Sequence, residues 1–363
     1  MPPHVINAAS GNAVSADLSA ELIAHVERAL ADKAPLRIQG GNSKAFYGRP
    51  VDGGLLDTRG HRGIVSYDPT ELVITARAGT PLSDVEAALD AAGQMLPCEP
   101  PHFGANATVG GMVATGLSGP RRPWVGSVRD FVLGCRVITG GAKYLRFGGE
   151  VMKNVAGYDV SRLMVGSLGC LGLITEVSFK VLPKPRNSVS LRLEVDTDTA
   201  LARFAEWGQQ PLPITAACHD GEALMLRLEG GEGSVAAARE RLGGEAVSPA
   251  FWQALREHEL AFFQDPRPLW RLSVANDSRP ALPAGRQLID WGGAQRWLKT
   301  EADADAIRAA ATAAGGHASC FTPGVTDSPL HPLPDVLLRY HRQLKAQLDP
   351  QGLFNPGRMY AGV

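Results

Sequence analysis

The glycine-rich stretch Pro101–Gly119 constrains this chain more than any other part of its sequence. It reads PHFGANATVGGMVATGLSG and combines glycine with alanine, threonine and serine, with almost no charge. The stretch shows neither a helical nor a strand period, and it has too few large side chains to predict a contribution to a hydrophobic core. Glycine lacks the Cβ that would hold a ligand away from the backbone, so we expect this segment to approach something flat or anionic.

Two further glycine-rich loops lie in the same half of the chain. They span Arg37–Gly48 (RIQGGNSKAFYG) and Gly157–Thr175 (GYDVSRLMVGSLGCLGLIT). Three such loops predict one large cofactor that carries phosphate. Within the third loop, GSLGCLG at Gly166–Gly172 follows a predicted helix and precedes a predicted strand at Leu173–Leu182, which is the reverse of the order in a nicotinamide site.

The first of these loops follows a predicted buried strand at Leu36–Gln39. The backbone N–H groups of residues 40–43 (GGNS) could form a nest for an anion, with the Ser43 hydroxyl as an additional donor. A simple turn between two strands is the alternative interpretation. The sequence lacks the Lys-Ser/Thr of a Walker A loop, and it also lacks the GxGxxG of a dinucleotide-binding fold.

Two helices are predicted before the central stretch. Leucine or valine recurs every four residues from Leu18 to Leu30, which predicts a helix capped by Asp17 or Ser15. A β-rich run at Leu72–Ala76 leads through Gly79-Thr80 into a second helix. We expect Ser83 and Glu86 to form a capping box at its start.

The totals of the sequence exclude several classes of protein. The chain has 363 residues, enough for two domains, and its net charge of −1 gives no field to attract nucleic acid or an anionic membrane. It has no apolar run of about 18 residues, and the N-terminal residues do not resemble an export signal. The five cysteines form no CxxC pair, so we expect reduced thiols in a cytoplasmic protein and no iron–sulfur cluster in this chain.

The character of the sequence changes after Lys184–Arg186. Strands at 189–196, 214–219, 223–229 and 245–247 alternate with helices at 197–207 and 234–242, which is the order of a ferredoxin-like unit. Further strands are predicted at 269–275, 287–291 and 317–321, with helices at 251–263, 302–314 and 336–348. We therefore predict an α+β protein with domains at 1–186 and 187–363, the second an antiparallel sheet covered by helices. The tail DPQGLFNPGRMY is expected to dock through its apolar residues.

The glycine-rich loops and their flanking segments together resemble the PCMH-type FAD-binding domain of the vanillyl-alcohol oxidase family. The matching pieces in order are RIQGGNSKAF, Gly79-Thr80, PHFGANATVGGMVATGLSG, GSVRDFVLGCRVITG and NVAGYDVSRLMVGSLGCLGLITEVSFKVLP. The tail LDPQGLFNPGRMY is similar to the end of the FAD-linked oxidase C-terminal domain. The resemblance implies a two-subdomain FAD-binding domain followed by that C-terminal domain.

The resemblance also implies which residues meet the cofactor. The first loop would wrap the FAD diphosphate, the central stretch would lie along diphosphate and flavin, and the third loop would approach through its backbone. With Gly79 and Thr80 from the strand-to-helix turn, the implied cofactor-binding residues are Gly40, Gly41, Asn42, Ser43, Gly79, Thr80, Pro101, Thr108, Gly110, Gly111, Ala114, Gly119, Gly169, Gly172 and Ile174. The first loop has no His or Cys, so we expect non-covalent FAD.

Details such as QGGNSKAFYGRP, CEPPHFG, GPRRPW and RFGGEVMKNVAGYD are similar to FAD-binding subunits of bacterial oxidases that act on glycolate. This implies oxidation of glycolate, and of short D-2-hydroxy acids, to the 2-oxo acid within a multisubunit complex. The implied partners are a paralogous FAD-binding catalytic subunit and an iron–sulfur subunit. The chain would be cytoplasmic and would reach the inner face of the membrane only through these partners.

The chain departs from hydroxy acid dehydrogenases of this family in its second half. It lacks their HxGDGNxH motif, and the nearest remnant is Gly315–Ala318 around His317, which we expect to start a strand. We predict no metal site and identify no catalytic residue. Arg121, Arg122 and Arg358 could bind a carboxylate, although a solvated turn is the favoured interpretation of GPRRPW. A flavin-bearing scaffold and an autonomous FAD-dependent dehydrogenase stay open as alternatives.

Overall fold

The computed structural model describes residues 15–150 and 158–363, and it divides the chain into two compact units. Unit 1 comprises Met1–Leu117, Ser127–Pro183 and Leu333–Val363, and unit 2 comprises Ser118–Gly126 and Lys184–Pro332. The boundary predicted after residue 186 therefore lies close to the observed one. The predicted second domain at 187–363 is not one unit, because the final helix and tail pack into unit 1.

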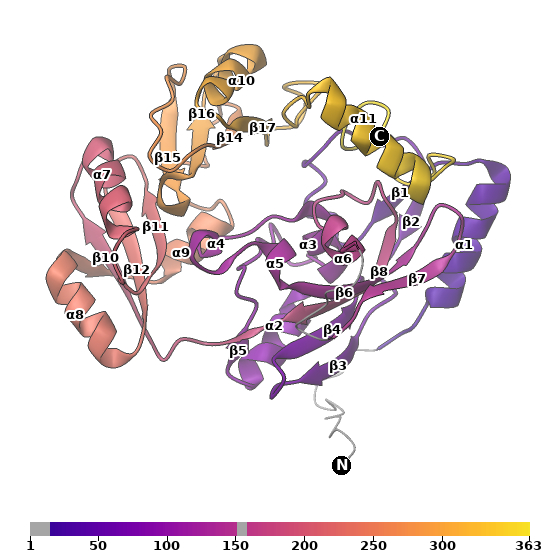
Figure 1. Cartoon of the computed structure of the whole chain (residues 1–363), viewed down its shortest axis with the longest axis horizontal. Coiled ribbons are helices and arrows are strands. Elements are labelled where there is room, and N and C mark those ends of the chain that lie inside the picture. Colours follow the sequence, from indigo (N-terminus) through magenta and orange to yellow (C-terminus); the bar gives the residue numbers. More distant parts are fainter. Residues whose placement is uncertain (1–14, 151–157) are drawn as a thin grey trace. The chain divides into compact units, whose positions relative to one another are not determined.

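Unit 1 is built on a five-stranded antiparallel sheet in the order β3-β4-β8-β6-β7, with a two-stranded parallel sheet β1-β2 and a short pair β5-β9 (Figure 1). Its helices and strands are α1 (Ser19–Asp32), β1 (Leu36–Gln39), β2 (Gly54–Asp57), β3 (Ile64–Asp68), β4 (Val73–Arg77), α2 (Leu82–Ala91), β5 (Gln94–Met95), α3 (Val109–Thr115), α5 (Val128–Phe131), β6 (Val132–Ile138), β7 (Tyr144–Gly148), α6 (Val160–Leu163), β8 (Leu173–Lys180), β9 (Leu182–Pro183) and α11 (Asp335–Leu348).

The C-terminal tail docks as predicted. Leu353 and Phe354 are buried in one hydrophobic cluster with Leu22 and Val26 of α1 and with Leu36 of β1. A parallel bridge pairs Leu36 with Phe354, which places the tail beside β1. The end of the chain thus belongs to the core of the unit that carries the first glycine-rich loop.

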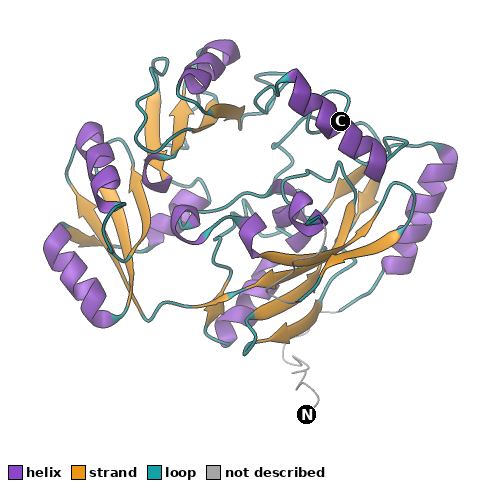
Figure 2. Ribbon diagram, in the orientation of Figure 1, coloured by secondary structure: helices purple, strands orange, loops and turns teal. Residues whose placement is uncertain are grey.

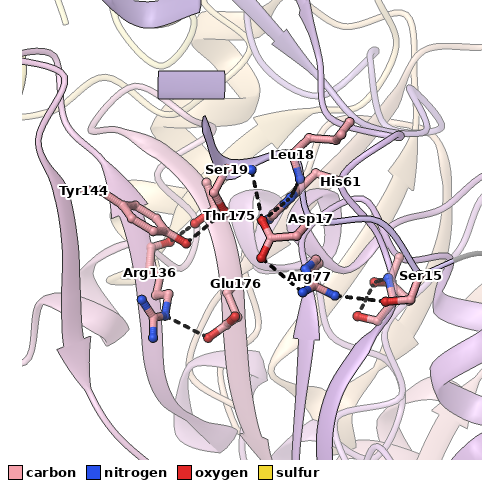
Figure 3. Close-up of polar contacts among 12 residues, drawn as sticks. Ser15, Asp17, Leu18, Ser19, His61, Arg77, Arg136, Tyr144, Thr175 and Glu176 are labelled. Carbon is pink, nitrogen blue, oxygen red and sulfur yellow. Dashed lines mark hydrogen bonds and ion pairs between the residues drawn. The ribbon is translucent and has the colours of Figure 1, made fainter. Parts of the chain in front are cut away.

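The segment before α1 is held to the five-stranded sheet by polar contacts (Figure 3). Arg77 of β4 donates to the Ser15 hydroxyl at 3.1 Å and to the Asp17 carboxylate at 3.2 Å. Hydrogen bonds from Ser19, and the charge of Arg77, lower the pKa of Asp17 to about 2. The N-cap of α1 is Leu18, without a side-chain cap, so neither Asp17 nor Ser15 holds the predicted position.

The predicted capping box of α2 is wrong. The helix begins at Leu82 with Pro81 as N-cap, and no side chain caps it. The Leu82 N–H donates instead to the Ala107 carbonyl at 2.9 Å. A backbone acceptor from the central stretch thus takes the place of a local cap, which only tertiary packing could supply.

Unit 2 contains an eight-stranded antiparallel sheet in the order β13-β10-β12-β11-β15-β16-β14-β17 (Figure 2). Its elements are α4 (Arg122–Val125), β10 (Asn187–Leu193), α7 (Thr197–Trp207), β11 (Ile214–His219), β12 (Leu224–Gly230), α8 (Glu232–Leu242), β13 (Glu245–Val247), α9 (Ala250–Arg256), β14 (Leu269–Ser273), β15 (Arg286–Asp290), the 3-10 turn η1 (Trp291–Gly293), β16 (Gln295–Lys299), α10 (Ala304–Ala313) and β17 (His317–Cys320).

The ferredoxin-like order predicted for residues 189–247 is confirmed, and the second half of the sheet repeats it. In the first half the last strand lies beside the first, giving β13-β10-β12-β11, with α7 and α8 packed on one face. The same order recurs as β17-β14-β16-β15, where only α10 covers the sheet. Strand β16 (QRWLK) was not predicted, because three of its five buried residues are polar and hide the alternation.

Candidate functional site

The first glycine-rich loop follows β1 and carries a run of backbone N–H donors at residues 40–43. Asn42 adopts a left-handed conformation with φ of 60°, as one residue of an anion-binding nest commonly does. In the part of the chain that the structure describes, no acceptor meets the backbone N–H groups of residues 40–43. A Cβ on Gly41 would lie 1.4 Å from the Asn106 carbonyl oxygen, so the loop requires glycine where it passes the central stretch.

The central stretch contains a helix that the sequence did not predict. Thr108 caps α3 by accepting a hydrogen bond from the Gly111 N–H at 3.3 Å, and Gly116 ends it with φ of 64°. Val109, Met112 and Val113 are buried, so this segment does contribute to the core. The expectation of a purely irregular loop was wrong. Gly110 and Gly111 lower the helix propensity of this seven-residue segment, although its apolar residues lie on one face of a helix.

The start of α3 is tied to the turn between β4 and α2. The N–H groups of Val109 and Gly110 donate to the carbonyls of Thr80 at 2.9 Å and Ala78 at 2.7 Å. A Cβ on Gly110 would lie 2.8 Å from the Ala78 Cβ, whereas a Cβ on Gly111 would meet only the Thr108 hydroxyl, at 3.3 Å. Gly110 therefore permits packing within the protein, and Gly111 leaves space open.

The third loop is joined to β1 through Asn355 of the C-terminal tail. The Ile38 N–H donates to Asn355 Oδ1 at 2.8 Å, and Asn355 Nδ2 donates to the Leu168 carbonyl at 2.7 Å. Gly169 has φ of 74° and runs against the Asn355 amide, where a Cβ would lie 2.6 Å from Nδ2. The start of this loop at Gly157 lies outside the described residues.

These segments enclose one cavity of about 330 Å³ within unit 1, which is in the size range of cofactor pockets. Most of the residues that the sequence singled out line it, namely Gly40, Gly41, Asn42, Ser43, Thr108, Gly110, Gly111, Ala114, Gly169, Gly172 and Ile174. Sequence reasoning did not place the remaining lining residues there, namely Arg37, Ile38, Gln39, Lys44, Ala45, Pro50, Val51, Thr58, Ala78, Thr115, Leu168, Asn355 and Arg358.

Four singled-out residues do not line this cavity. Gly79 packs against the turn at Thr58, whose carbonyl oxygen would lie 2.0 Å from a Cβ at that position. The Thr80 hydroxyl accepts from the Gly63 N–H at 2.9 Å, and Pro101 is buried away from the lining. Gly119 belongs to unit 2, where its carbonyl accepts from the Trp291 indole at 3.0 Å.

The cavity is cationic. Among the described residues, the charged ones that line it are Arg37, Lys44 and Arg358, with no Asp or Glu. The Lys44 ammonium lies beside the nest, donating to Ser43 Oγ at 3.4 Å and to the His102 carbonyl at 3.1 Å. Burial and the neighbouring Arg37 charge lower the pKa of Arg358. A pocket with this balance favours an anionic ligand.

The arginine loop GPRRPW is part of unit 2 and is only partly solvated: residues 122–124 are exposed, whereas residues 119–121 are buried. Arg121 is buried and pairs with Glu229 at 2.5 Å, which also lies 3.5 Å from Arg227. The guanidinium carbon of Arg122 lies 4.4 Å from the centre of the Trp291 ring. Among the three arginines considered for a carboxylate, only Arg358 lines the cavity.

The described ranges contain neither a metal-binding cluster nor a membrane-spanning helix. No group of three His, Cys, Asp or Glu side chains there is placed to hold a metal ion. No helix there is both long and apolar enough to cross a membrane. All five cysteines are buried, and burial raises the pKa of Cys98 and of Cys135 to about 12.

His317 begins β17, as predicted, and its side chain is exposed. Its ring centre lies 6.4 Å from that of His331, which accepts a hydrogen bond from the Ala318 N–H. We expect His317→Ala to change any catalytic activity of the protein by no more than about twofold, because this exposed side chain does not line the cavity. Steady-state kinetics tests this, and a loss of tenfold or more would assign His317 a functional role.

The comparisons with known proteins agree with this geometry. Residues 13–148 match the FAD binding domain family. The chain is 64% identical over 345 residues to the glycolate oxidase subunit GlcE of Escherichia coli strain K12, covering 95% of this chain and 98% of that protein. The chain belongs to the GlcE family. The GlcE family carries an FAD binding domain, so its cofactor is FAD and its members are flavin-dependent oxidoreductase subunits.

More distant relatives match part of the chain. The glycolate oxidase subunit GlcD of Bacillus subtilis strain 168 is 35% identical over 143 residues, 39% of this chain and 30% of that protein. A D-lactate dehydrogenase of Archaeoglobus fulgidus is 30% identical over 218 residues, 59% of this chain and 48% of that protein. A solved alkyldihydroxyacetonephosphate synthase aligns with 93% of this chain and 74% of its own at a TM-score of 0.64 and 17% identity, a likeness of fold alone.

Proposed function

We propose that this GlcE-family chain is the FAD-binding subunit of a glycolate oxidase complex. The complex oxidises glycolate, and related short D-2-hydroxy acids, to the 2-oxo acid and passes the electrons to an iron–sulfur subunit. The observation that carries the proposal is 64% identity that extends over nearly the whole of both chains. The cationic cavity between three glycine-rich loops supports it independently.

The residues of the cavity fit FAD, which supplies a hydride acceptor and an electron relay when bound. The N–H groups of residues 40–43 and the Lys44 ammonium would hold the diphosphate, because residues 40–44 all line the cavity and these groups are donors. Gly111 and Gly172 would let flat rings approach the backbone. The apolar side chains of Ile38 and Ile174 would exclude water from them.

The cofactor is non-covalent in this proposal. The side chains that relatives use to attach a flavin are His and Cys, and neither type is among the described residues that line the cavity. Non-covalent contacts from the nest and from Lys44 would hold the diphosphate, and Arg37 and Arg358 would complete the positive field around it. Strong acid would therefore release the flavin from the protein.

Substrate chemistry is assigned to a partner subunit. The described residues offer no metal-binding cluster, and the cavity lining offers no His or carboxylate that could act as a general base. The five cysteines form no CxxC pair, and no group of three His, Cys, Asp or Glu side chains in the described ranges could serve as ligands of an iron–sulfur cluster. We therefore propose a paralogous flavin subunit and an iron–sulfur subunit as partners, which would also bring this chain to the inner face of the membrane.

A flavin-bearing scaffold is the second candidate function. The absence of a metal-binding cluster in the described ranges favours it, because hydroxy acid dehydrogenases of the vanillyl-alcohol oxidase family use such a motif. An autonomous FAD-dependent dehydrogenase is the third candidate. The three candidates differ in how the bound flavin responds to glycolate.

The test is a visible absorption spectrum of the purified full-length chain, before and after acid precipitation, followed by anaerobic addition of glycolate. We expect a flavin spectrum that moves to the supernatant on precipitation and does not bleach with glycolate. The same chain in its assembled complex should bleach. Bleaching of the isolated chain would instead show an autonomous dehydrogenase, and an assembled complex that is fully active after loss of this flavin would show a scaffold.

A further inference from the structure

The three glycine-rich loops around the cavity of unit 1 are joined to one another at two places. The first loop meets the central stretch, where the Lys44 ammonium donates to the His102 carbonyl at 3.1 Å. The central stretch meets the third loop, where the Leu168 N–H donates to the Ala114 carbonyl at 2.8 Å. Among the described residues, no backbone hydrogen bond joins the first loop directly to the third. That junction therefore depends on another segment of the chain.

Asn355 of the C-terminal tail makes this junction with its side-chain amide. Its Oδ1 atom accepts from the Ile38 N–H at 2.8 Å, and its Nδ2 atom donates to the Leu168 carbonyl at 2.7 Å. Ile38 lies two positions before the nest at residues 40–43, and Leu168 lies directly before Gly169 of the cavity lining. One side chain thus links the strand that leads into the nest with the third loop.

The amide of Asn355 is held in one orientation. Asn355 is 3% exposed, and its own N–H donates to the Leu36 carbonyl at 2.9 Å. A backbone N–H can only donate and a carbonyl can only accept, so the oxygen and nitrogen of the amide cannot exchange places between Ile38 and Leu168. Removing the amide would leave both backbone groups without these partners, and the separation of the two loops would no longer be fixed.

The tail is also anchored independently of the Asn355 amide. The Lys345 ammonium of α11 donates to Asp349 Oδ2 and to the carbonyls of Cys170 and Phe354, each at 2.7 Å. Phe354 is itself fully buried in the hydrophobic cluster beneath β1. The tail should therefore stay docked when only the amide is removed, so the effect of the amide can be measured separately from tail docking.

We propose that Asn355 is a positioning residue for FAD, which holds the first and third loops at the separation at which both can reach the cofactor. The inference rests on the proposed function for the placement of FAD in this cavity. A ligand that meets two segments binds more tightly when their separation is already set, because binding then does not have to order them. Asn355 acts in this way through the backbones of Ile38 and Leu168.

The experiment uses the full chain without flavin and two alanine variants. Asn355→Ala removes the link between the loops. Gln94→Ala is the matched control, because Gln94 is also a buried amide of unit 1 with two hydrogen bonds. Its side chain accepts from the Tyr67 hydroxyl at 2.8 Å and donates to the Pro69 carbonyl at 2.7 Å, and it does not line the cavity.

Two quantities are measured on proteins whose circular dichroism spectra show that they are folded. The first is the dissociation constant of FAD, followed by flavin fluorescence. The second is hydrogen–deuterium exchange of the flavin-free proteins over residues 36–48 and 166–172. We expect Asn355→Ala to bind FAD at least tenfold more weakly than the wild type and to exchange at least threefold faster over both segments. Gln94→Ala should stay within about twofold of the wild type in both quantities.

Equal FAD affinity of the two variants would overturn the proposal, because it would leave Asn355 a purely structural role. Weaker FAD binding with unchanged exchange would also overturn it, since Asn355 would then act by touching the cofactor itself. A third measurement needs no variant: FAD should slow exchange over residues 352–358 of the wild type by at least threefold, because coupling between two sites is reciprocal. Unchanged exchange there would contradict the proposal. A wild-type chain that binds no FAD would instead contradict the proposed function, whereas every other contrary outcome leaves FAD in the cavity.

Discussion

Gly111→Val is expected to weaken FAD binding by more than about 100-fold while the protein remains folded. A Cβ at Gly111 would meet only the Thr108 hydroxyl, at 3.3 Å, so the branched side chain would project into the cavity. Each added methyl group would occupy space that the cofactor needs. Either the cofactor or the surrounding protein would have to shift, and that shift costs binding free energy. Titration of the apoprotein with FAD, followed by flavin fluorescence, measures the loss.

Gly233→Val is the control for this substitution. Gly233 lies in α8 of unit 2, and a Cβ there has no atom within 4 Å outside the helix's own backbone. The same change of residue type should therefore leave FAD affinity unaltered. Full flavin occupancy of Gly111→Val, with a circular dichroism spectrum like that of the wild type, would show that the cofactor does not run along α3.

Lowering the pH from about 6.5 to about 3 is expected to destabilise unit 2 through His258. Loss of hydration, together with the charges of Arg271 and Lys299, holds the pKa of His258 at about 3. Its ring stacks on Phe263 at 4.0 Å and lies 4.6 Å from the Trp297 ring. In the unfolded chain His258 takes up a proton near pH 6.5, whereas in the folded chain it stays neutral until about pH 3. The contribution of neutral His258 to stability is therefore fully present above pH 6.5 and is lost as the pH falls from 6.5 to 3. The slope is up to about 1.4 kcal/mol per pH unit.

His258→Phe isolates this contribution. Phenylalanine keeps an aromatic ring against Phe263 and removes the titrating group. The backbone at this position has φ of 58° and is strained with either residue. We expect the variant to lose less stability than the wild type between pH 6.5 and pH 4, measured by urea unfolding at each pH. Parallel curves for the two proteins would mean that His258 is protonated in the fold at these pH values.

Strong local patterns predicted most of the fold. Helix α7, strand β11 and strand β13 have the predicted bounds. In α7 the buried residues Ala200, Leu201, Phe204 and Trp207 keep the helical period. The three glycine-rich loops were expected to meet around one ligand, and residues of all three line one cavity. The ferredoxin-like order followed from the order of the elements alone.

The same local reasoning missed residues whose role depends on distant partners. Asn355 lies 317 positions from Ile38 and 187 from Leu168, yet its amide joins both at the cavity. Nothing in the NPGR sequence around it indicates those partners. Thr80 shows the opposite error. Sequence reasoning expected it at the cofactor, but its hydroxyl accepts from the Gly63 N–H and donates to the Gly63 carbonyl, so it has no donor left for a ligand.

The sequence by itself determined most of the element types, the family and the positions of the loops that surround the proposed FAD, but not helix α3 or strand β16. Only the tertiary structure decided that the tail closes the cavity with Asn355 and Arg358, that residues 118–126 belong to unit 2, and that α11 buries Lys345 while it exposes apolar side chains. The physical reason is common to all three. Each depends on which distant groups satisfy a buried hydrogen-bonding or charged group, and local propensity does not encode that choice.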